Sequence, residues 1–276
     1  MNTAPIKIPS RTLNKFITSL VLIMTLAACS NVEIPEREWK ETDDPLKYWA
    51  EVLDKHVDVQ GRIDFSGLAA APENLLVFLN YVKQTSPHTH PADFTSSHAA
   101  IAYYINAYNA LAMYNIILLG FPEALRGWRK LDYFLLKRFN IGGQRNSLYG
   151  FENRIIRKLG EERVHFALNC MSVGCPRLPA VPFTPENLEK QLDQQARRFF
   201  GEDRYLQVDR SRKTVRVSEI LDFFTEDFTI RSGTLINYIN RYREERIPGS
   251  YRVEFLDYDW TVNRQPIKTG QALKAR

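Results

Sequence analysis

The fold is decided by Ser97-His-Ala-Ala-Ile-Ala-Tyr-Tyr-Ile-Asn-Ala-Tyr-Asn-Ala-Leu-Ala-Met-Tyr-Asn-Ile-Ile-Leu-Leu119, the longest apolar segment with helical periodicity. It is apolar on most sides, so it predicts a buried central helix, with Ser97 as its cap and a stop at Gly120. Asn106 and Asn109 lie three residues apart on one face of that helix. Because a buried amide must be hydrogen-bonded, these side chains either tie the helix to a neighbouring loop or bind substrate.

Amphipathic segments surround this helix in the sequence. Asp44 as N-cap and Pro45 at the first helical position predict a helix that ends at Gly61. The same reasoning predicts helices over 72–83, 147–160, 185–201, 218–228 and 235–242. A compact apolar run predicts a buried strand over 164–168, a charged turn predicts a hairpin of 205–208 with 214–217, and alternation predicts a last strand over 251–255. We therefore predict an α+β fold, a mostly helical single domain with a small, largely antiparallel sheet.

The first 28 residues have the order of a secretory signal peptide. Lys7, Arg11 and Lys15 precede the apolar run 16–26, and small residues then lead to Cys29. Eleven residues reach only about 16 Å, about half of a bilayer core, so this run does not predict a membrane span. The ending Leu-Ala-Ala-Cys29 resembles the bacterial lipobox, in which the cysteine is lipidated and the signal is removed. It predicts a protein anchored to the membrane through an N-terminal lipid, and Ser30 after the cysteine resembles the signal for the outer membrane facing the periplasm.

Charge and length limit the partners and the domain organisation. The chain has 37 basic and 32 acidic residues; removing the three basic residues of the signal leaves 34 against 32, a formal charge of +2. This balance gives no reason to expect a nucleic-acid partner. We predict a removed signal over 1–28, a tether over 29–43, one globular domain over 44–263 and a tail over 264–276.

The richest chemistry lies in His165-Phe-Ala-Leu-Asn-Cys-Met-Ser-Val-Gly-Cys-Pro-Arg177. A thiol is a nucleophile as the thiolate, and a neighbouring imidazole both lowers its pKa and takes its proton. Cys170 or Cys175 is then a candidate nucleophile, His165 a candidate base and Asn169 a candidate orienting group.

The spacing leaves alternatives open. In a regular strand His165 and Asn169 point to one face and Cys170 to the other, which disfavours a direct dyad. Cys175 could fold back toward His165, or Cys170 could meet a distant histidine such as His98. The two cysteines could also form a disulfide, since five positions and a turn at Gly174 bring them within reach in an oxidising compartment.

Other candidate groups are weaker. Arg177 is a possible substrate-binding residue beside the cysteines. The paired thiols and the histidines at 88 and 90 do not match the usual spacing of metal ligands, so we predict no metal and no other cofactor. Asp222 and Glu226 are i, i+4 neighbours that suit either acid/base chemistry or a solvated helix face.

Five segments in the same order resemble the domain of unknown function 547 family. They are Tyr104-Ile-Asn-Ala-Tyr-Asn-Ala-Leu111, His165-Phe-Ala-Leu-Asn-Cys-Met-Ser-Val-Gly-Cys-Pro176, Phe183-Thr-Pro-Glu-Asn-Leu188, Ser218-Glu-Ile-Leu-Asp-Phe-Phe-Thr-Glu-Asp-Phe228 and Leu256-Asp-Tyr-Asp-Trp-Thr-Val-Asn263. The resemblance covers about 160 residues. It implies no activity, cofactor or catalytic residue, so function rests on the residues themselves.

Two functions follow from the residues. The first is a thiol-dependent hydrolase or acyl transferase acting on peptide or peptidoglycan material, with a nucleophile from the Cys170 and Cys175 pair. The second is a non-catalytic binding or scaffold lipoprotein, with the same two cysteines in a disulfide that closes the loop.

Overall fold

The computed structural model describes residues 30–38 and 43–266. The predicted signal peptide and Cys29 lie outside the described residues, as does most of the predicted tail. Within the described residues, no helix is both long and apolar enough to cross a membrane.

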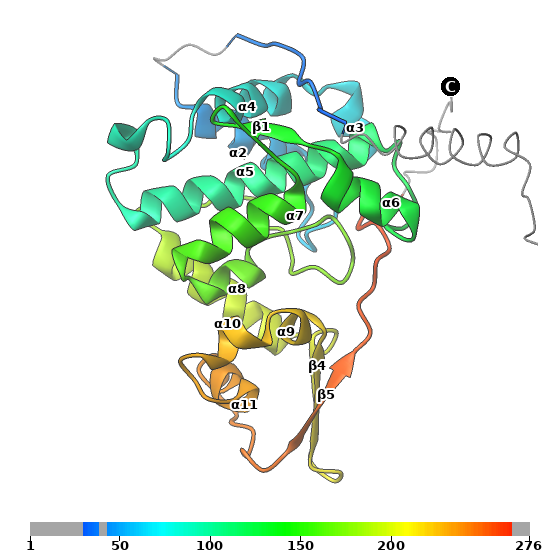
Figure 1. Ribbon diagram of the computed structural model, residues 1–276. Coiled ribbons are helices and arrows are strands. Elements are labelled where there is room, and N and C mark those ends of the chain that lie inside the picture. Colours follow the sequence, from blue (N-terminus) through cyan, green and yellow to red (C-terminus); the bar gives the residue numbers. More distant parts are fainter. Residues whose placement is uncertain (1–29, 39–42, 267–276) are drawn as a thin grey trace, which may run out of the picture.

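Helix α5 (Ser97–Leu118) is the centre of the helical part of the protein. Every residue from Ile101 to Ile116 is buried, as the unbroken apolar pattern predicts. Its N-cap is Ser96, one residue before the predicted cap, and the Ser96 hydroxyl accepts a hydrogen bond from the Ala99 backbone N–H at 3.1 Å. Figure 1 shows α5 between α2 and α4 on one side and α7 on the other.

Short helices pack around α5. Asp44 caps α2 (Pro45–His56), as predicted, although the helix ends five residues before Gly61. The others in this part are α3 (Phe65–Ala70), α4 (Glu73–Gln84), α6 (Trp128–Leu131) and α7 (Leu148–Phe151), and π- and 3₁₀-helical turns prolong α7 through η3 (Glu152–Ile156) and η4 (Arg157–Leu159).

A hairpin covers one end of these helices. Strands β1 (Phe139–Ile141) and β2 (Gln144–Asn146) pair antiparallel, with Ile141 opposite Gln144. The two residues between them, Gly142 and Gly143, have φ angles of +52° and +80°. This left-handed pair forms the tight two-residue turn that suits the twist of a hairpin, and glycine adopts it at little cost.

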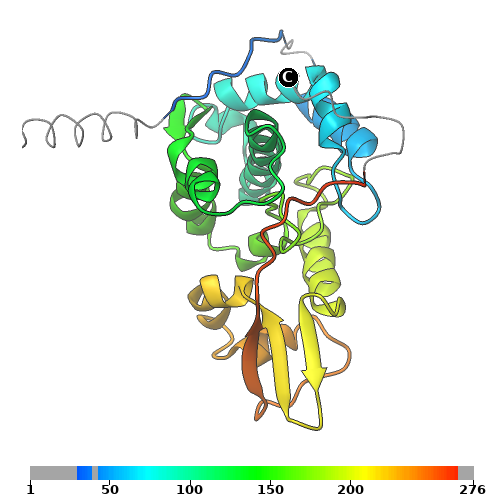
Figure 2. The same ribbon diagram turned by 90° about the vertical axis from the view of Figure 1, so that its right-hand side faces the viewer.

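A second part of the protein packs below the first (Figures 1 and 2). Its three-stranded sheet has the order β3 (Leu206–Asp209), β4 (Thr214–Ser218), β5 (Arg252–Leu256), with β3 and β4 antiparallel and β4 and β5 parallel. Helices α8 (Leu188–Gly201), α9 (Ile220–Phe223), α10 (Thr225–Thr229) and α11 (Leu235–Ile239) complete it. The fold is α+β as predicted, with two small sheets in place of one.

Two local predictions are wrong. Residues 164–168 do not form a strand: Glu162–Phe166 is a 3₁₀ turn (η5), capped by the Glu161 carboxylate on the Arg163 N–H at 3.0 Å. A short apolar run has no periodicity that separates a strand from a buried turn. The predicted helix 218–228 breaks at Phe224 into α9 and α10, so Asp222 and Glu226 do not lie one turn apart on one helix.

The segment after β5 runs back to the helical part, as the red trace in Figure 2 shows. The Asn263 N–H donates to the Met171 carbonyl at 2.9 Å, and the Val173 and Gly174 N–H groups donate to the Thr261 and Asp259 carbonyls, each at 2.8 Å. This pairing lays residues 258–264 beside the predicted cysteine loop. The site therefore combines segments almost ninety residues apart in the sequence.

Candidate active site

The cysteine loop, residues 170–177, holds two thiols in contact. Cys170 and Cys175 are free, buried cysteines whose sulfurs lie 2.6 Å apart. The Cys170 backbone N–H points to Cys175 Sγ at 2.9 Å. Met171 has a φ of +64°, a left-handed conformation that costs a non-glycine residue about 1 kcal/mol or more. The loop is thus held in a strained turn that brings the two sulfurs together.

The Asn169 side chain hydrogen-bonds to the backbone near both ends of this loop. Its carbonyl oxygen accepts from the Met171 N–H at 2.7 Å, and its amide donates to the Pro176 carbonyl at 2.6 Å. The side chain is buried and does not line the cavity that contains the thiols. Its contacts within the described structure shape the loop.

Tyr258, in the segment that returns after β5, contacts both thiols through its hydroxyl. Its hydroxyl lies 3.2 Å from Cys170 Sγ and 3.0 Å from Cys175 Sγ, and Ser172 donates to it at 3.1 Å. A Cβ at Gly174 would lie 2.9 Å from the Tyr258 ring, so glycine is needed for this approach. No sequence pattern pairs Tyr258 with the loop, because the contact is tertiary.

These contacts give the two thiols different pKa values. Burial opposes ionisation of Cys175, but hydrogen bonds from Cys170, Tyr258 and Ser172 outweigh it and lower the pKa of Cys175 to about 7. Burial, with the hydrogen bond and negative charge of Cys175, raises the pKa of Cys170 well above its usual value. Of the two candidate nucleophiles, Cys175 is therefore the one ionised near neutral pH.

The thiols lie at a cavity of about 860 Å³. Its apolar wall comes from α6 and the residues after it, from α9, and from the returning segment; it comprises Leu131, Phe134, Leu135, Phe223, Phe224 and Trp260. Leu131 and Phe223 remain 45% and 48% exposed, so the apolar wall continues to the surface. Lys130 also lines the cavity, with its Nζ 3.3 Å from the centre of the Trp260 ring. This apolar lining suits a ligand with an apolar part.

Glu152 is a cavity residue that sequence reasoning did not single out. It accepts a hydrogen bond from the Tyr108 hydroxyl at 3.2 Å. Burial, together with the nearby charges of Cys175 and Asp227, raises its pKa to about 7 against that hydrogen bond. The sequence does contain a signal for Glu152. It lies four residues after Leu148 and three residues before Ile155, so the predicted helix places this carboxylate on its apolar face.

His165 lines the same cavity and contacts an ion pair formed by Asp227 and Arg157. Its Nε2 lies 2.8 Å from Asp227 Oδ2. Arg157 donates a hydrogen bond to each carboxylate oxygen of Asp227, both at 2.7 Å. Burial lowers the pKa of His165 more than Asp227 raises it, so the ring is neutral at pH 7 and its Nε2–H donates to the carboxylate. The His165 ring also stacks on Phe224 with centroids 4.0 Å apart. No described hydrogen bond joins His165 to either sulfur.

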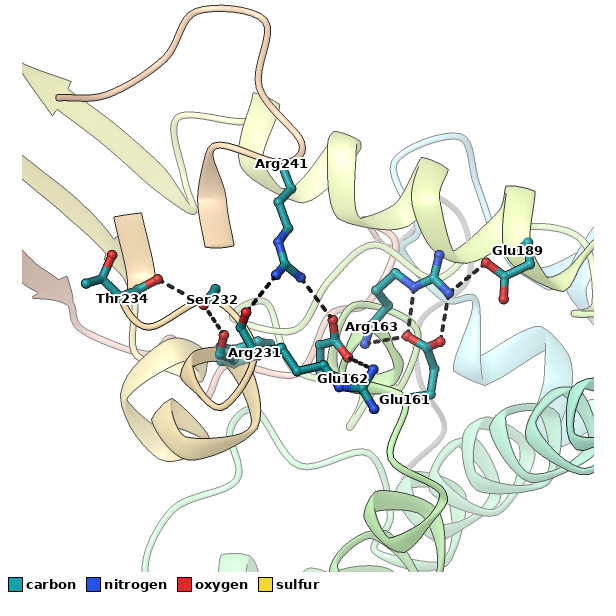
Figure 3. A network of polar contacts seen from close by, with 9 residues as sticks. Glu161, Glu162, Arg163, Glu189, Arg231, Ser232, Thr234 and Arg241 are labelled. Atoms are coloured by element: carbon teal, nitrogen blue, oxygen red, sulfur yellow. Dashed lines mark hydrogen bonds and ion pairs between the residues drawn. The ribbon is translucent and has the colours of Figure 1, made fainter. Parts of the chain in front are cut away.

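A network of ion pairs fixes the turn that carries His165 (Figure 3). Arg163 binds both oxygens of Glu161 at 2.7 Å and reaches Glu189 of α8 at 2.8 Å. Glu162 lies 3.7 Å from Arg241 and 3.9 Å from Arg231. The network thus joins η5 to α8 and to the segments around α10 and α11, and it positions His165 from outside the cavity.

The remaining candidate residues lie elsewhere. Asn106 and Asn109 are buried and hydrogen-bond to the backbone of Phe183 and of Ala167 and Asn169, and neither lines the cavity. His98 pairs with Glu189 at 3.3 Å, away from the thiols. Arg177 lines a different cavity. Among the described residues, no group of three or more His, Cys, Asp or Glu side chains is arranged to hold a metal ion.

Comparison with protein families gives a match over the middle of the chain. Residues 92–200 match the family described as "Protein of unknown function, DUF547". The DUF547 match includes α5, Glu152, His165 and the cysteine loop, and it supports the family resemblance predicted from the sequence. Asp227 and Tyr258 lie beyond its end. No curated protein and no solved structure matches the chain.

The raised pKa of Glu152 predicts that the stability of the protein depends on pH. Between about pH 4.5 and 7 the folded protein keeps a proton on Glu152 that the unfolded chain has released, so the free energy of unfolding falls as pH rises through this range. A shift from 4.5 to about 7 corresponds to about 3 kcal/mol. Glu152→Gln removes this loss. Urea unfolding in reductant at pH 4.5 and pH 8 should show the variant gaining up to about 3 kcal/mol on wild type at the higher pH.

The control for this prediction is Glu186→Gln, a change at an exposed carboxylate outside the cavity. It should leave the pH dependence of wild type unchanged. Parallel pH profiles for wild type and Glu152→Gln would contradict a Glu152 that stays protonated in the folded protein.

Proposed function

We propose that this protein is a thiol-dependent hydrolase or acyl transferase with Cys175 as its nucleophile. One observation carries the proposal: a thiol with its pKa lowered to about 7 and a carboxyl with its pKa raised to about 7 line one cavity. Such pairs of shifted groups are typical of catalytic sites.

The reaction follows from these two groups. The Cys175 thiolate attacks an acyl carbonyl carbon, a bond forms from Sγ to that carbon, and the bond to the leaving group breaks. Protonated Glu152 gives its proton to the leaving amine or alcohol. The Glu152 carboxylate then takes a proton from water or an acceptor, which attacks the thioester and releases Cys175. The acid/base role goes to Glu152 in preference to His165 because the charge of Cys175 acts on Glu152, whereas no described hydrogen bond joins His165 to either sulfur.

The cavity wall supports a choice of substrate class. Its apolar residues suit an acyl chain or an apolar side chain, and Lys130 offers one positive charge for a carboxylate. We propose amides or esters of peptide or peptidoglycan material that carry such an apolar part.

Acylation by activated esters tests the function. We expect p-nitrophenyl hexanoate to give a hexanoyl adduct on Cys175, faster than p-nitrophenyl acetate gives an acetyl adduct, because the longer chain contacts the apolar wall. Intact mass and peptide mapping of the reduced protein measure the adduct. Cys170→Ser is the matched control and should still be acylated. Acylation spread over surface lysines, with Cys175 unmodified, would overturn the proposal.

The location is a separate proposal. The lipobox-like Leu-Ala-Ala-Cys29 supports a mature protein that begins at lipidated Cys29, anchored in the bacterial envelope, in the outer membrane facing the periplasm. Mass spectrometry of the native N-terminus should find a diacylglycerol thioether and an acylated amine on Cys29. An unmodified Cys29 or an intact signal would contradict the anchor.

A second function is favoured by the closeness of the two sulfurs. At 2.6 Å, Cys170 and Cys175 are about half an ångström from disulfide bonding distance, so oxidation requires little movement. In that case the protein is a non-catalytic binding or scaffold lipoprotein with a closed 170–175 loop. The number of free thiols in protein isolated without reductant separates the two functions.

A further inference from the structure

A second cavity, of about 480 Å³, is lined by the same two segments as the thiol cavity. The thiol cavity uses Cys170, Cys175 and Pro176 of one segment with Tyr258 and Trp260 of the other. The second cavity uses Val173 and Arg177 with residues 261–264, and it shares no lining residue with the first. The cysteine loop and the returning segment therefore form a common wall between two separate cavities.

Four guanidinium groups surround the second cavity: Arg62, Arg177, Arg204 and Arg264. They come from four regions of the chain that the fold brings together. Such convergence of arginine side chains is typical of sites for carboxylate or phosphate groups, because each guanidinium offers a planar fork of donors.

Three of these arginines use only part of their donor capacity. Arg62 Nε pairs with Asp58 at 2.8 Å. Arg177 and Arg204 share one carboxylate, Glu202, at 2.8 and 2.9 Å, so two positive charges meet one negative charge. Arg177 Nε has no hydrogen bond of good geometry there. Within the described structure, the terminal nitrogens of these three side chains donate no hydrogen bond to protein.

Arg264 has no carboxylate partner among the described residues. Its Nη2 donates to the backbone carbonyls of Phe121, at 3.0 Å, and Pro122, at 2.5 Å, which orient the group without neutralising its charge. One exposed carboxylate, Glu123, also lines the cavity and has no ion pair in the described part of the chain. Together with Asp58 and Glu202, three carboxylates face four guanidiniums, which leaves one positive charge and many free donors.

We propose that this cavity is a binding site for an anionic ligand with several oxygens, of the carboxylate or phosphate class. The cavity offers the unpaired terminal nitrogens of Arg62, Arg177 and Arg204, together with Arg264, whose Nη2 is held by two backbone carbonyls. Its location behind the cysteine loop is distinct from the proposed acyl site, so the proposal does not depend on Cys175 chemistry.

Calorimetric titration of the purified protein with inorganic phosphate and with succinate tests the site. Arg204→Gln and Arg62→Gln should each weaken binding about tenfold, the expected loss for a charge-assisted hydrogen bond. Glu123→Gln should strengthen binding several-fold because it removes the unpaired negative charge at the cavity. General damage to the fold cannot produce such a gain. Arg216→Gln, at an exposed arginine on β4, is the matched control and should bind as wild type does.

The two ligands distinguish the source of the anion. Tighter binding of phosphate assigns the site to phosphoryl groups, and tighter binding of succinate assigns it to carboxylates such as those of peptides. Absence of saturable binding for both ligands would overturn the proposal. Binding that Arg204→Gln, Arg62→Gln and Glu123→Gln leave equal to that of Arg216→Gln would also overturn it.

Discussion

Cys175→Ser should abolish rapid alkylation of the reduced protein at pH 7. With a pKa of about 7, half of Cys175 is thiolate at this pH, whereas a thiol at or above the ordinary value of 9.0, such as Cys170, is about 1% thiolate or less. Iodoacetamide labelling, followed by peptide mapping, should therefore be about fiftyfold slower in Cys175→Ser than in wild type. Cys170→Ser keeps a hydroxyl beside Cys175 and should retain labelling within about threefold of wild type.

Tyr258→Phe tests the cause of this reactivity. The change removes the hydroxyl 3.0 Å from Cys175 Sγ and keeps the ring that packs on Gly174. The pKa of Cys175 should rise, so labelling at pH 7 should slow by about three- to tenfold and recover at pH 9. Equal labelling of both cysteines in wild type, or faster labelling at pH 7 in Tyr258→Phe, would contradict the role given to Cys175.

The same reagent separates an enzyme from a scaffold. Protein isolated without reductant should present one rapidly labelled thiol if Cys175 is a working nucleophile. No free thiol, with Cys170→Ser and Cys175→Ser lowering the melting temperature equally, would favour a structural disulfide. Because the loop is short, that loss should be smaller than the roughly 3 kcal/mol expected from chain entropy for a fifteen-residue loop.

The sequence predicts best those elements whose signals are local. Asp44 and Pro45 start α2 because a cap acts on the N–H groups two or three residues away. The buried α5 follows from its composition alone, and the hairpin of β3 and β4 follows from alternation around a charged turn. In each case the deciding residues lie within one turn of the element.

The site depends on contacts that no local pattern encodes. Residues 164–168 form a turn because the Val164 carbonyl accepts from the Ala167 and Leu168 N–H groups, which leaves no edge for a strand partner. Tyr258 reaches the thiols, and Asp227 reaches His165, only after distant segments pack. The residue types at 165–177 indicated thiol chemistry, but the choice of Cys175 and the recruitment of Glu152 required the tertiary structure.

Asn109 shows how the central helix builds this site. Its amide donates to the Ala167 carbonyl at 3.0 Å, and its carbonyl oxygen accepts from the Asn169 N–H at 2.8 Å. Both backbone groups immediately precede the cysteine loop and are buried with it. One side chain of α5 therefore satisfies two backbone groups that no helix or strand pairs.

Asn109→Ala should destabilise the protein by about 2–6 kcal/mol, because it leaves two buried backbone groups without partners at about 1–3 kcal/mol each. That is a large part of the roughly 5–15 kcal/mol typical of folded proteins. Urea unfolding in reductant measures the loss, and Asn74→Ala, which removes an exposed bond to Glu51, should cost less than about 1 kcal/mol. The start of the loop also loses its support, so Cys170 labelling should rise relative to Cys175. A loss below about 1 kcal/mol with an unchanged labelling ratio would show that α5 does not hold the loop.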